Sequence, residues 1–296
     1  MPKITVLVTF YDRERYLEKC LESLKVQTFK DFKAILLDDG STDGSRAIAQ
    51  KFCDSDCRFM LLGDKHIGFP QIKNFGLDNV DTEYLIFLDS DDFVHPRWLE
   101  YLYKVARATD ADISACAYHR FWPISEQDVL RRLMNNPRLT FSLHEWDKMN
   151  LLLYHGCCVF MWNKLFRTKL FDGLRFEDVI ALSDLRICGE LFERANYVTF
   201  IRSPLIFYRQ HDESMGATTR AMGIEYYRYR FESFIKLYTP IWDKYPQTHA
   251  RIREIFEAEL RMASSHLGED VAVPLAKMPF VDMVLKAKID YPYVVI

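Results

Sequence analysis

Apolar residues are patterned in two ways over the first 121 positions of the chain. Continuous apolar runs, typical of strands that are buried on both faces, occupy residues 4–10, 32–37, 58–62, 84–88 and 111–121. Between these runs, apolar residues recur with a helical period in residues 13–26, 44–52, 68–79 and 95–108. This order predicts a mostly parallel sheet that is covered by helices and built from right-handed crossovers.

The alternation of strands and helices ends after Phe121. Residues 123–140 are polar and contain two prolines, which predicts a loop or a short helix over the edge of the sheet. The later predicted elements are a helix at 145–155, a pair of strands at 196–201 and 205–208, and long helices at 221–242 and 249–266. The tail, 271–296, is mixed. We therefore expect an α/β fold with a helical C-terminal appendage.

Composition and charge narrow the class of protein. A formal net charge of -3 argues against a generic nucleic-acid binder, which would be basic. No apolar run approaches the ~18 residues of a membrane span. The first predicted strand begins at about Lys3, so we expect no signal peptide before it. Seven cysteines without a paired Cys-x-x-Cys arrangement predict reduced thiols in a cytoplasmic protein.

Three carboxylates follow the apolar run 84–88 directly. Asp89, Asp91 and Asp92 stand where that strand ends, and ligands of open α/β sheets bind beyond the carboxyl ends of the strands. Neighbouring carboxylates repel one another unless a cation joins them. Hard oxygen ligands suit Mg²⁺ or Mn²⁺, which in turn hold diphosphates. The alternative is a solvated turn that is rich in aspartate.

Two other predicted strands also end in polar groups. Thr9, Tyr11 and Asp12 stand at the end of the first strand, and Asp38 and Asp39 stand at the end of the second. A parallel sheet brings these strand ends together. A hydroxyl, an aromatic face and a carboxylate beside a metal site suit a nucleotide. There is no Gly-x-Gly-x-x-Gly or P-loop motif, so a dinucleotide or P-loop site is poorly supported.

In their order along the chain, these motifs resemble those of the family 2 glycosyltransferases, a large inverting group with the GT-A fold. The resemblance rests on VLVTFYDRERYLEKCLESLKVQTFKDF, DDGSTDGS, LDSDD, WNKLF and YRQHDES. It covers about residues 3–212. It implies a glycosyltransferase domain at 1–212, with a nucleotide half at about 1–92 and an acceptor half at about 93–212. A helical extension would follow at 213–296.

The resemblance implies residues for the sugar donor and for a metal ion. Thr9, Tyr11 and Asp39 fall where the family holds the uracil and ribose of a nucleotide sugar, and Asp38 is expected to support the loop. The other residues implied for the donor are Lys73, Asp89, Ser90 and Asp91. Those implied for a Mn²⁺ or Mg²⁺ cofactor are Asp91, Asp92 and His211.

The resemblance also implies a role for Arg209. Lys73, His211 and Arg209 each have an alternative explanation. Lys73 stands where many relatives have arginine, so it keeps the charge without the bidentate geometry; otherwise it is a surface lysine on a helix. His211 approaches the metal or the diphosphate, or is a polar residue in a loop after a strand. Arg209 neutralises phosphate charge, or is a surface residue.

An inverting transferase needs a carboxylate that takes the proton of the attacking hydroxyl. Relatives often carry Glu-Asp at the start of a helix, about a dozen residues before a strand. Glu177-Asp178 matches by letters, but Asp184 matches by spacing and is the predicted base. Ser183 then replaces the usual glutamate. Asp184 also suits a helix N-terminus on its own account.

The acceptor side is less defined. Trp162, Asn163 and Lys164 match a segment near the acceptor pocket, where Trp162 stacks on a sugar or is a core residue. The stretch 220–242 is rich in aromatic and basic residues. It predicts either a helix packed on the main domain or a peripheral contact with the inner face of the plasma membrane. The extension is also a candidate homodimer interface.

The expected function is metal-dependent transfer of a sugar from a nucleoside-diphosphate sugar, UDP-linked, to a hydroxyl of a saccharide or lipid-linked acceptor. The anomeric centre would invert. One alternative is a nucleotidyltransferase, which would usually show a Gly-rich, basic loop after the first strand. The other is an inactive relative that binds saccharides or nucleotides, and the serine before Asp184 favours it. No nucleic-acid partner is expected.

Overall fold

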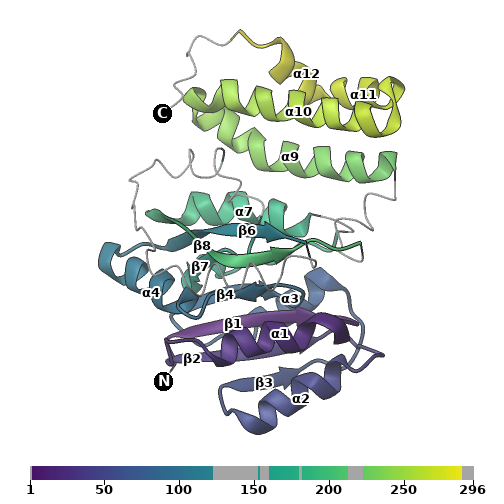
Figure 1. Cartoon of the computed structure of the whole chain (residues 1–296). Helices are drawn as coiled ribbons and strands as arrows, with labels where there is room; N and C mark the ends of the chain where they lie inside the picture. The colour runs from purple at the N-terminus through teal and green to yellow at the C-terminus, as the bar shows by residue number, and fades with distance from the viewer. Residues whose placement is uncertain (1, 123–152, 154–159, 180–181, 213–222, 289–296) are drawn as a thin grey trace.

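The structure, a computed structural model of the whole chain, describes residues 2–122, 153, 160–179, 182–212 and 223–288 (Figure 1). These residues form an eight-stranded mixed sheet with helices on both faces. The strands are β1 (Ile4–Phe10), β2 (Phe32–Asp38), β3 (Phe59–Leu62), β4 (Tyr84–Asp89), β5 (Phe93–Val94), β6 (Ile113–Phe121), β7 (Lys164–Arg167) and β8 (Val198–Arg209). The α-helices are α1 (Glu14–Lys25), α2 (Ser45–Ser55), α3 (Phe69–Leu77), α4 (Trp98–Thr109), α7 (Ser183–Arg194), α9 (Ile224–Lys244), α10 (His249–Leu267), α11 (Glu269–Ala276) and α12 (Pro279–Lys286). Two short 3₁₀ helices are η2 (Thr168–Phe171) and η3 (Pro246–Thr248).

The strands follow the order β3-β2-β1-β4-β7-β6-β8-β5 across the sheet. β1 pairs in parallel with β2 and β4, β2 with β3, and β6 with β8, which confirms the prediction of a mostly parallel α/β sheet. β7 runs antiparallel to both β4 and β6. β4 and β6 therefore point the same way, and the carboxyl ends of all the parallel strands share one edge of the sheet, the carboxyl edge.

The sequence pattern fails where the strands are short or interrupted. The prediction of two strands at 196–201 and 205–208 is wrong, because β8 runs through both segments. Pro204 lies inside it, and the register with β6 shifts there, since proline has no N–H to give to the ladder. β5 and β7 were not predicted. The elements expected at 123–140 and 145–155 lie outside the described residues, apart from Leu153.

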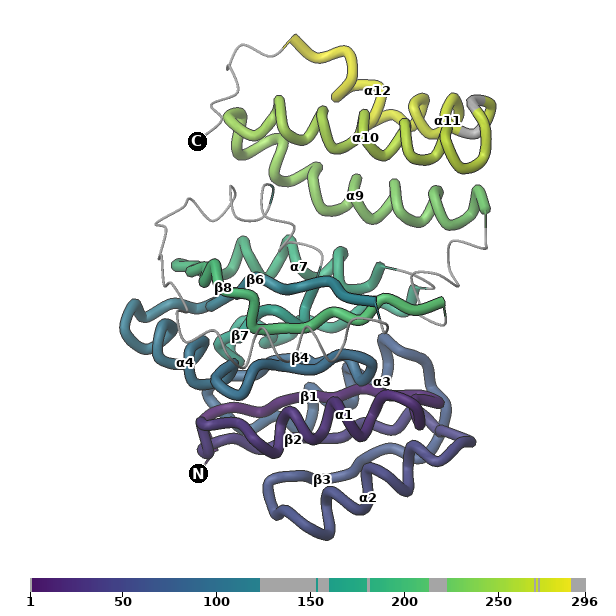
Figure 2. Tube along the Cα trace, in the orientation of Figure 1, coloured from purple at the N-terminus to yellow at the C-terminus, as the bar shows by residue number. Residues whose placement is uncertain are grey.

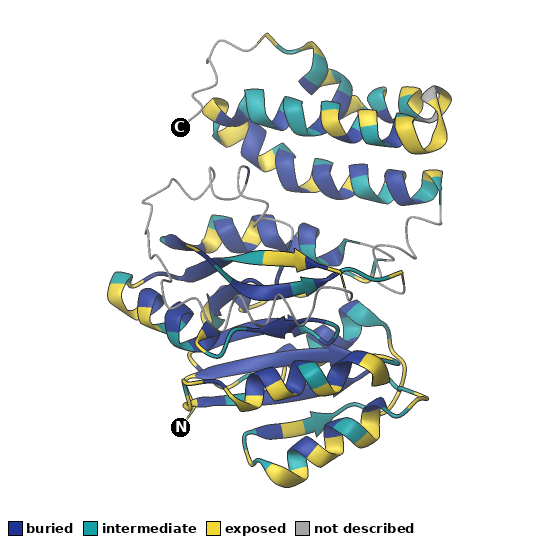
Figure 3. Cartoon of the chain, in the orientation of Figure 1, coloured by how far each residue is buried: buried dark blue, intermediate teal, exposed yellow. Residues whose placement is uncertain are grey.

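Alternate residues of the central strands face two separate cores. Val6 and Val8 of β1 pack with residues of α1, α2 and α4 on one face, whereas Leu7 packs with residues of α3, α7 and α9 on the other. Figure 3 shows the central strands buried along their length. This double burial explains the continuous apolar runs of the sequence, and it leaves the ends of the strands to carry polar groups.

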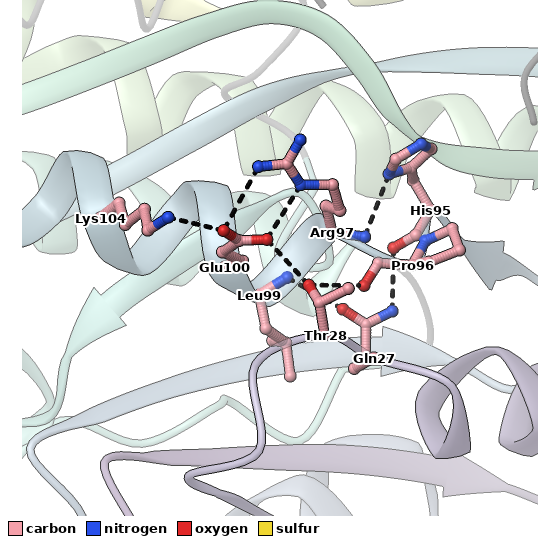
Figure 4. Close-up of polar contacts among 8 residues, drawn as sticks. All are labelled: Gln27, Thr28, His95, Pro96, Arg97, Leu99, Glu100 and Lys104. Atoms are coloured by element: carbon pink, nitrogen blue, oxygen red, sulfur yellow. Dashed lines mark hydrogen bonds and ion pairs between the residues drawn. The ribbon is translucent and has the colours of Figure 1, made fainter. Parts of the chain in front are cut away.

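Gln27, which follows α1, fixes the start of α4 (Figure 4). Its Nε2 atom donates to the carbonyl oxygen of His95 at 2.8 Å, and its Oε1 atom accepts the N–H of Leu99 at 3.1 Å. Leu99 lies in the first turn of α4, where N–H groups lack an intrahelical partner. A fully buried side chain from another element supplies that partner. The segment that follows the acidic motif is thereby held against α1.

Helices α9 to α12 stack outward from α7 (Figures 1 and 2). Tyr227, Phe231 and Tyr238 of α9 are at most 2% exposed, and the ring of Phe231 lies 5.8 Å from that of Phe256 of α10. The aromatic side chains of α9 therefore pack inside the protein, as expected for a helix packed on the main domain, whereas residues 220–222 lie outside the described residues. None of the described helices has the length and apolarity needed to cross a membrane. The predicted division at 92 and 212, and the dimer interface, stay predictions.

Candidate functional site

The register of the sheet brings the predicted motifs together at the carboxyl edge. Thr9 of β1 stands beside Asp89 of β4, and Phe10 of β1 stands beside Asp38 of β2. The N–H of Asp39 then donates to the carbonyl oxygen of Phe10 at 2.9 Å. Motifs that are about 30 and 50 residues apart in the sequence therefore form one surface, as expected for parallel strands.

Asp89, Asp91 and Asp92 form the acidic cluster of this edge. Each offers a carboxylate oxygen, and these oxygens lie within 4.8 Å of one another. Burial raises the pKa of Asp89. The charge of Lys73 lowers it and that of Asp91 raises it, and the resulting value is about 7. Burial and the charges of Asp91 and Asp89 raise the pKa of Asp92 well above its ordinary value. A cation would relieve this repulsion.

The residues of this cluster fit a divalent cation. The Oδ2 atom of Asp92 is buried and finds no hydrogen-bond partner among the described residues, and the same holds for Nδ1 of His211. The Nε2 atom of His211 lies 2.9 Å from Oδ2 of Asp91. Carboxylate oxygens suit Mn²⁺ or Mg²⁺. Asp91, Asp92 and His211 could therefore hold the ion that was predicted there, and Ser90 is buried in the same loop.

The end of β8 holds the acidic loop in place. The backbone N–H of Arg209 donates to Oδ1 of Asp92 at 2.8 Å, and its Nε donates to the carbonyl oxygen of Asp91 at 2.8 Å. Arg209 is 5% exposed, so the surface alternative for this residue is wrong. The ring of His211 packs against Tyr16 of α1 with a centroid distance of 4.7 Å. No sequence motif predicts this contact of Tyr16.

A second group surrounds the carboxylate of Asp39. Its Oδ1 atom accepts the N–H groups of Ile67 at 2.7 Å and Gly68 at 3.2 Å, and the Nδ1 atom of His66 lies 3.0 Å from its Oδ2. The ring of His66 also lies 4.6 Å from that of Tyr11, which is 40% exposed. The N–H of Gly68 also lies 3.2 Å from Oδ2, so these donors fix the orientation of the carboxylate of Asp39 at the edge. His66 was missed, although it follows β3 at the same edge.

Asp38 has the supporting role that was predicted for it. It is fully buried, and its Oδ1 atom accepts the N–H of Ser41 at 2.8 Å. Its Oδ2 atom forms an ion pair with Arg46 at 2.8 Å. Asp12, which follows β1, binds the same loop: its Oδ1 atom accepts the N–H of Thr42 at 2.7 Å. The loop that follows β2 is therefore fixed from both sides.

Asp184 lies in the first turn of α7, and its Oδ1 atom is 2.7 Å from Nζ of Lys73 on α3. Lys73 is 1% exposed, so the alternative of a surface lysine is wrong. Its ammonium group is enclosed by the rings of Phe69 at 4.0 Å, Phe176 at 5.1 Å and Phe87 at 5.6 Å. The donor contact predicted for Lys73 stays a prediction, since its observed ionic partner is Asp184.

The alternative base, Asp178, has a different setting. Asp178 is exposed, and its neighbour Glu177 forms ion pairs with Arg186 of α7 and Lys236 of α9. These contacts give Glu177 a structural role. Leu182, just before α7, has a φ of 62°, a costly conformation for a leucine that clusters at functional sites. The geometry favours Asp184.

The three residues predicted for the acceptor all point into the protein. Trp162 is 2% exposed, and Asn163 and Lys164 are fully buried. The Nδ2 atom of Asn163 donates to the carbonyl oxygen of Cys116 at 3.0 Å, and Nζ of Lys164 donates to Oδ1 of Asn163 at 2.7 Å. These contacts match the core alternative for Trp162, and an acceptor role for the three stays a prediction.

A mostly parallel sheet with an acidic motif at its carboxyl edge and a carboxylate at a nearby helix start is the GT-A arrangement of glycosyltransferases. The chain belongs to glycosyl transferase family 2, because the model of that family matches residues 5–169, more than half of its length. This membership favours a glycosyltransferase over the nucleotidyltransferase alternative.

Individual relatives agree with this membership. The chain is 30% identical over 215 residues to glycosyltransferase GlyA of Streptococcus pneumoniae, a match that covers 70% of the chain but only 30% of GlyA. A crystal structure of S. aureus TarS 1–349 in complex with UDP-GlcNAc is similar, with a TM-score of 0.61 and 19% identity, over 79% of the chain and 66% of TarS 1–349. The mannosyltransferase PcManGT from Pyrobaculum calidifontis, in complex with GDP-Man and Mn²⁺, gives a TM-score of 0.55 and 18% identity, over 95% of the chain and 81% of PcManGT. At these identities the two structures show a shared fold.

Proposed function

We propose that this protein transfers a sugar from a UDP-linked donor to a hydroxyl of a saccharide or lipid-linked acceptor, with inversion at the anomeric carbon. The observation that carries the proposal is the acidic cluster of Asp89, Asp91 and Asp92 at the carboxyl edge. The nucleotide would lie over the ends of β1 and β2, against Thr9, Tyr11 and Asp39. In this placement the N-terminal half of the domain binds the nucleotide, and the later half binds the acceptor.

The chain's own residues account for the steps of the reaction. Asp184 takes the proton of the attacking hydroxyl as the new bond between that oxygen and the anomeric carbon forms. The bond from the anomeric carbon to the diphosphate breaks, and the nucleoside diphosphate leaves with the electron pair. Lys73 holds the carboxylate of Asp184 in its orientation through the ion pair at 2.7 Å. A divalent cation held by Asp91, Asp92 and His211 would supply positive charge to the leaving diphosphate.

The ligands named for the two structural relatives support a nucleoside-diphosphate sugar as the donor class. TarS has been crystallised with UDP-GlcNAc, and PcManGT with GDP-Man and Mn²⁺. UDP is favoured here over GDP because Tyr11 and Asp39 lie where the family holds uracil. Arg209 neutralises charge beside the acidic loop, where the diphosphate would lie.

A thermal-shift screen tests the donor class. UDP, GDP and their sugars are added with Mn²⁺ or with a chelator. A ligand at ~100 times its Kd adds about 2.7 kcal/mol of apparent stability. We expect UDP to stabilise the protein only with the metal present. If no nucleotide stabilises the folded protein, the alternative of an inactive, saccharide-binding relative is favoured. Stronger stabilisation by GDP than by UDP would mean that the donor carries guanine in place of uracil.

A further inference from the structure

Four aromatic rings meet beside the acidic loop. This aromatic cluster consists of Tyr118 of β6, Phe160 and Trp162 before β7, and Tyr208 of β8. The six distances between ring centroids run from 4.6 Å for Phe160 and Trp162 to 6.2 Å for Tyr118 and Tyr208. Trp162 is buried beneath the others, whereas the other three rings are half-buried. Two strands, β6 and β8, and the segment before β7 thus contribute to one aromatic cluster.

The strand directions place the aromatic cluster at the carboxyl edge. β7 is antiparallel to both β4 and β6, so the carboxyl end of β6 lies at the same edge as Asp89. β8 is parallel to β6 and pairs Tyr208 with Arg120. The residue after Tyr208 is Arg209, whose N–H binds Asp92. A molecule lying on these rings would therefore be next to the donor site.

Arg120 extends over the aromatic cluster. Its guanidinium carbon lies 5.6 Å from the ring of Tyr118 and 5.9 Å from the ring of Tyr208. Its Nη2 atom donates to the hydroxyl oxygen of Tyr118 at 3.3 Å. The residue is exposed, and no carboxylate of the described residues forms an ion pair with it. Guanidinium has five N–H donors, so most of them are available to a ligand.

This combination fits a particular kind of ligand. A pyranose ring has a face of C–H groups that packs against aromatic rings, and a guanidinium fork matches a phosphate or carboxylate group. The rings and the cation together match a sugar that carries an anionic group.

We infer that Tyr118, Tyr208 and Arg120 form the acceptor subsite, and that it selects a saccharide bearing an anionic group, phosphate or carboxylate. The inference rests on the proposed function, because it uses the carboxyl edge as the reacting edge. It adds more exposed residues to the buried trio at 162–164, for which an acceptor role stays a prediction. Trp162 then supports the contacting rings from beneath.

The test is titration calorimetry with three small probes: methyl α-glucoside, glucose 1-phosphate and glucuronic acid. UDP and Mg²⁺ are present in excess to fill the donor site. We expect the anionic probes to bind about tenfold more tightly than the neutral glycoside, since a charge-assisted hydrogen bond contributes on this scale. Whichever anionic probe binds better identifies phosphate or carboxylate as the group that is recognised.

Variants decide whether Arg120 is responsible. Arg120→Ala should abolish the preference for the anionic probes, and Arg120→Lys should retain part of it because the charge remains without the planar fork. Tyr118→Leu should weaken all three probes by a similar factor. Lys51→Ala, which removes an exposed cation from α2 beyond the other end of the sheet, should change nothing.

Three results would overturn the inference. They are equal affinity for the charged and neutral probes, an unchanged preference in Arg120→Ala, and an equal loss in Lys51→Ala. Failure of the proposed function is seen separately, as the absence of UDP binding in the thermal-shift screen. The probe titrations still measure the dependence on Arg120 in that case, because they can be repeated without UDP.

Discussion

The Nζ atom of Lys73 lies 2.7 Å from Oδ1 of Asp184, although 111 residues separate them in the sequence. α3 and α7 cover the same face of the sheet, and each brings one member of the pair to the site. Lys73 is 1% exposed and Asp184 21%. The carboxylate thus faces the site while its counter-ion is buried beneath it. A carboxylate held in this way is restricted in its rotation, and a general base needs such fixed geometry toward the proton that it takes.

Replacing the proposed base gives the most direct prediction. We expect Asp184→Asn to lower kcat for sugar transfer by roughly 10²- to 10⁴-fold, the contribution of a positioned general base. The Kd of UDP should not change. Asp178→Asn is the matched control, because Asp178 is exposed and lies outside the ion pair. A normal rate for Asp184→Asn, or a collapse in Asp178→Asn, would reverse the assignment.

Lys73 offers a test that separates its two suggested roles. Lys73→Met should lower kcat, and it should reduce the free energy of unfolding by about 1–3 kcal/mol because Asp184 loses its partner but keeps some contact with water. Lys73→Arg should preserve more of both quantities. Urea denaturation and steady-state kinetics supply the numbers. If Lys73 instead contacts the donor, the KM for the donor rises while kcat is retained.

The pKa of Asp89 predicts a dependence of stability on pH in the metal-free protein. This pKa is raised to about 7 in the folded protein, against about 3.9 in an unfolded chain. The folded state therefore binds more protons between these values, and stability falls as the pH rises from about 4 to about 7. Above about pH 7 this contribution is level.

Asp89→Asn isolates this contribution. The free energy of unfolding of the variant minus that of the wild type should increase from pH 5 to pH 7 and then stay constant. Urea denaturation in the presence of a chelator measures it. Parallel curves for the two proteins would show that Asp89 titrates normally. Added Mg²⁺ should stabilise the wild type most above about pH 7, where Asp89 is ionised.

Gln27 should be important for stability although it is far from the chemistry. Its side chain makes three hydrogen bonds, to the carbonyl oxygens of Ser23 and His95 and from the N–H of Leu99. Gln27→Ala leaves these buried groups without a partner, so the free energy of unfolding should fall by at least about 2 kcal/mol. Gln50→Ala, at an exposed position on α2, should change it by less than about 0.5 kcal/mol. Similar losses in both variants would contradict this role.

The fold was predictable where local pattern and burial agree. β1, β2 and β4 are buried on both faces and appear in the sequence as apolar runs. β7 was not predictable, since its four residues include Lys164 and Arg167 and its place in the sheet depends on β4 and β6. Pro204 made β8 look like two strands, because the sequence does not show that a bulge accommodates it.

The site was predictable in its acidic parts and less so in its partners. Asp89, Asp91 and Asp92 are adjacent in the sequence, so one strand end brings them together. Lys73 and Asp184 meet only through the packing of two helices on one face, which no local pattern records. Burial of Trp162 likewise depends on rings from β6 and β8.

The bond from the N–H of Arg209 to Asp92 has a consequence for synthesis of the chain. The two residues are 117 positions apart, and a ribosome adds about 5–20 residues per second. The acidic loop therefore leaves the ribosome roughly ten seconds before the strand that restrains it. During that interval its carboxylates are hydrated and fully charged. The hydrogen bonds from Arg209 to Asp92 and Asp91 form only when β8 adds to the sheet, so the acidic loop reaches its restrained geometry well after β1 to β4 have been synthesised.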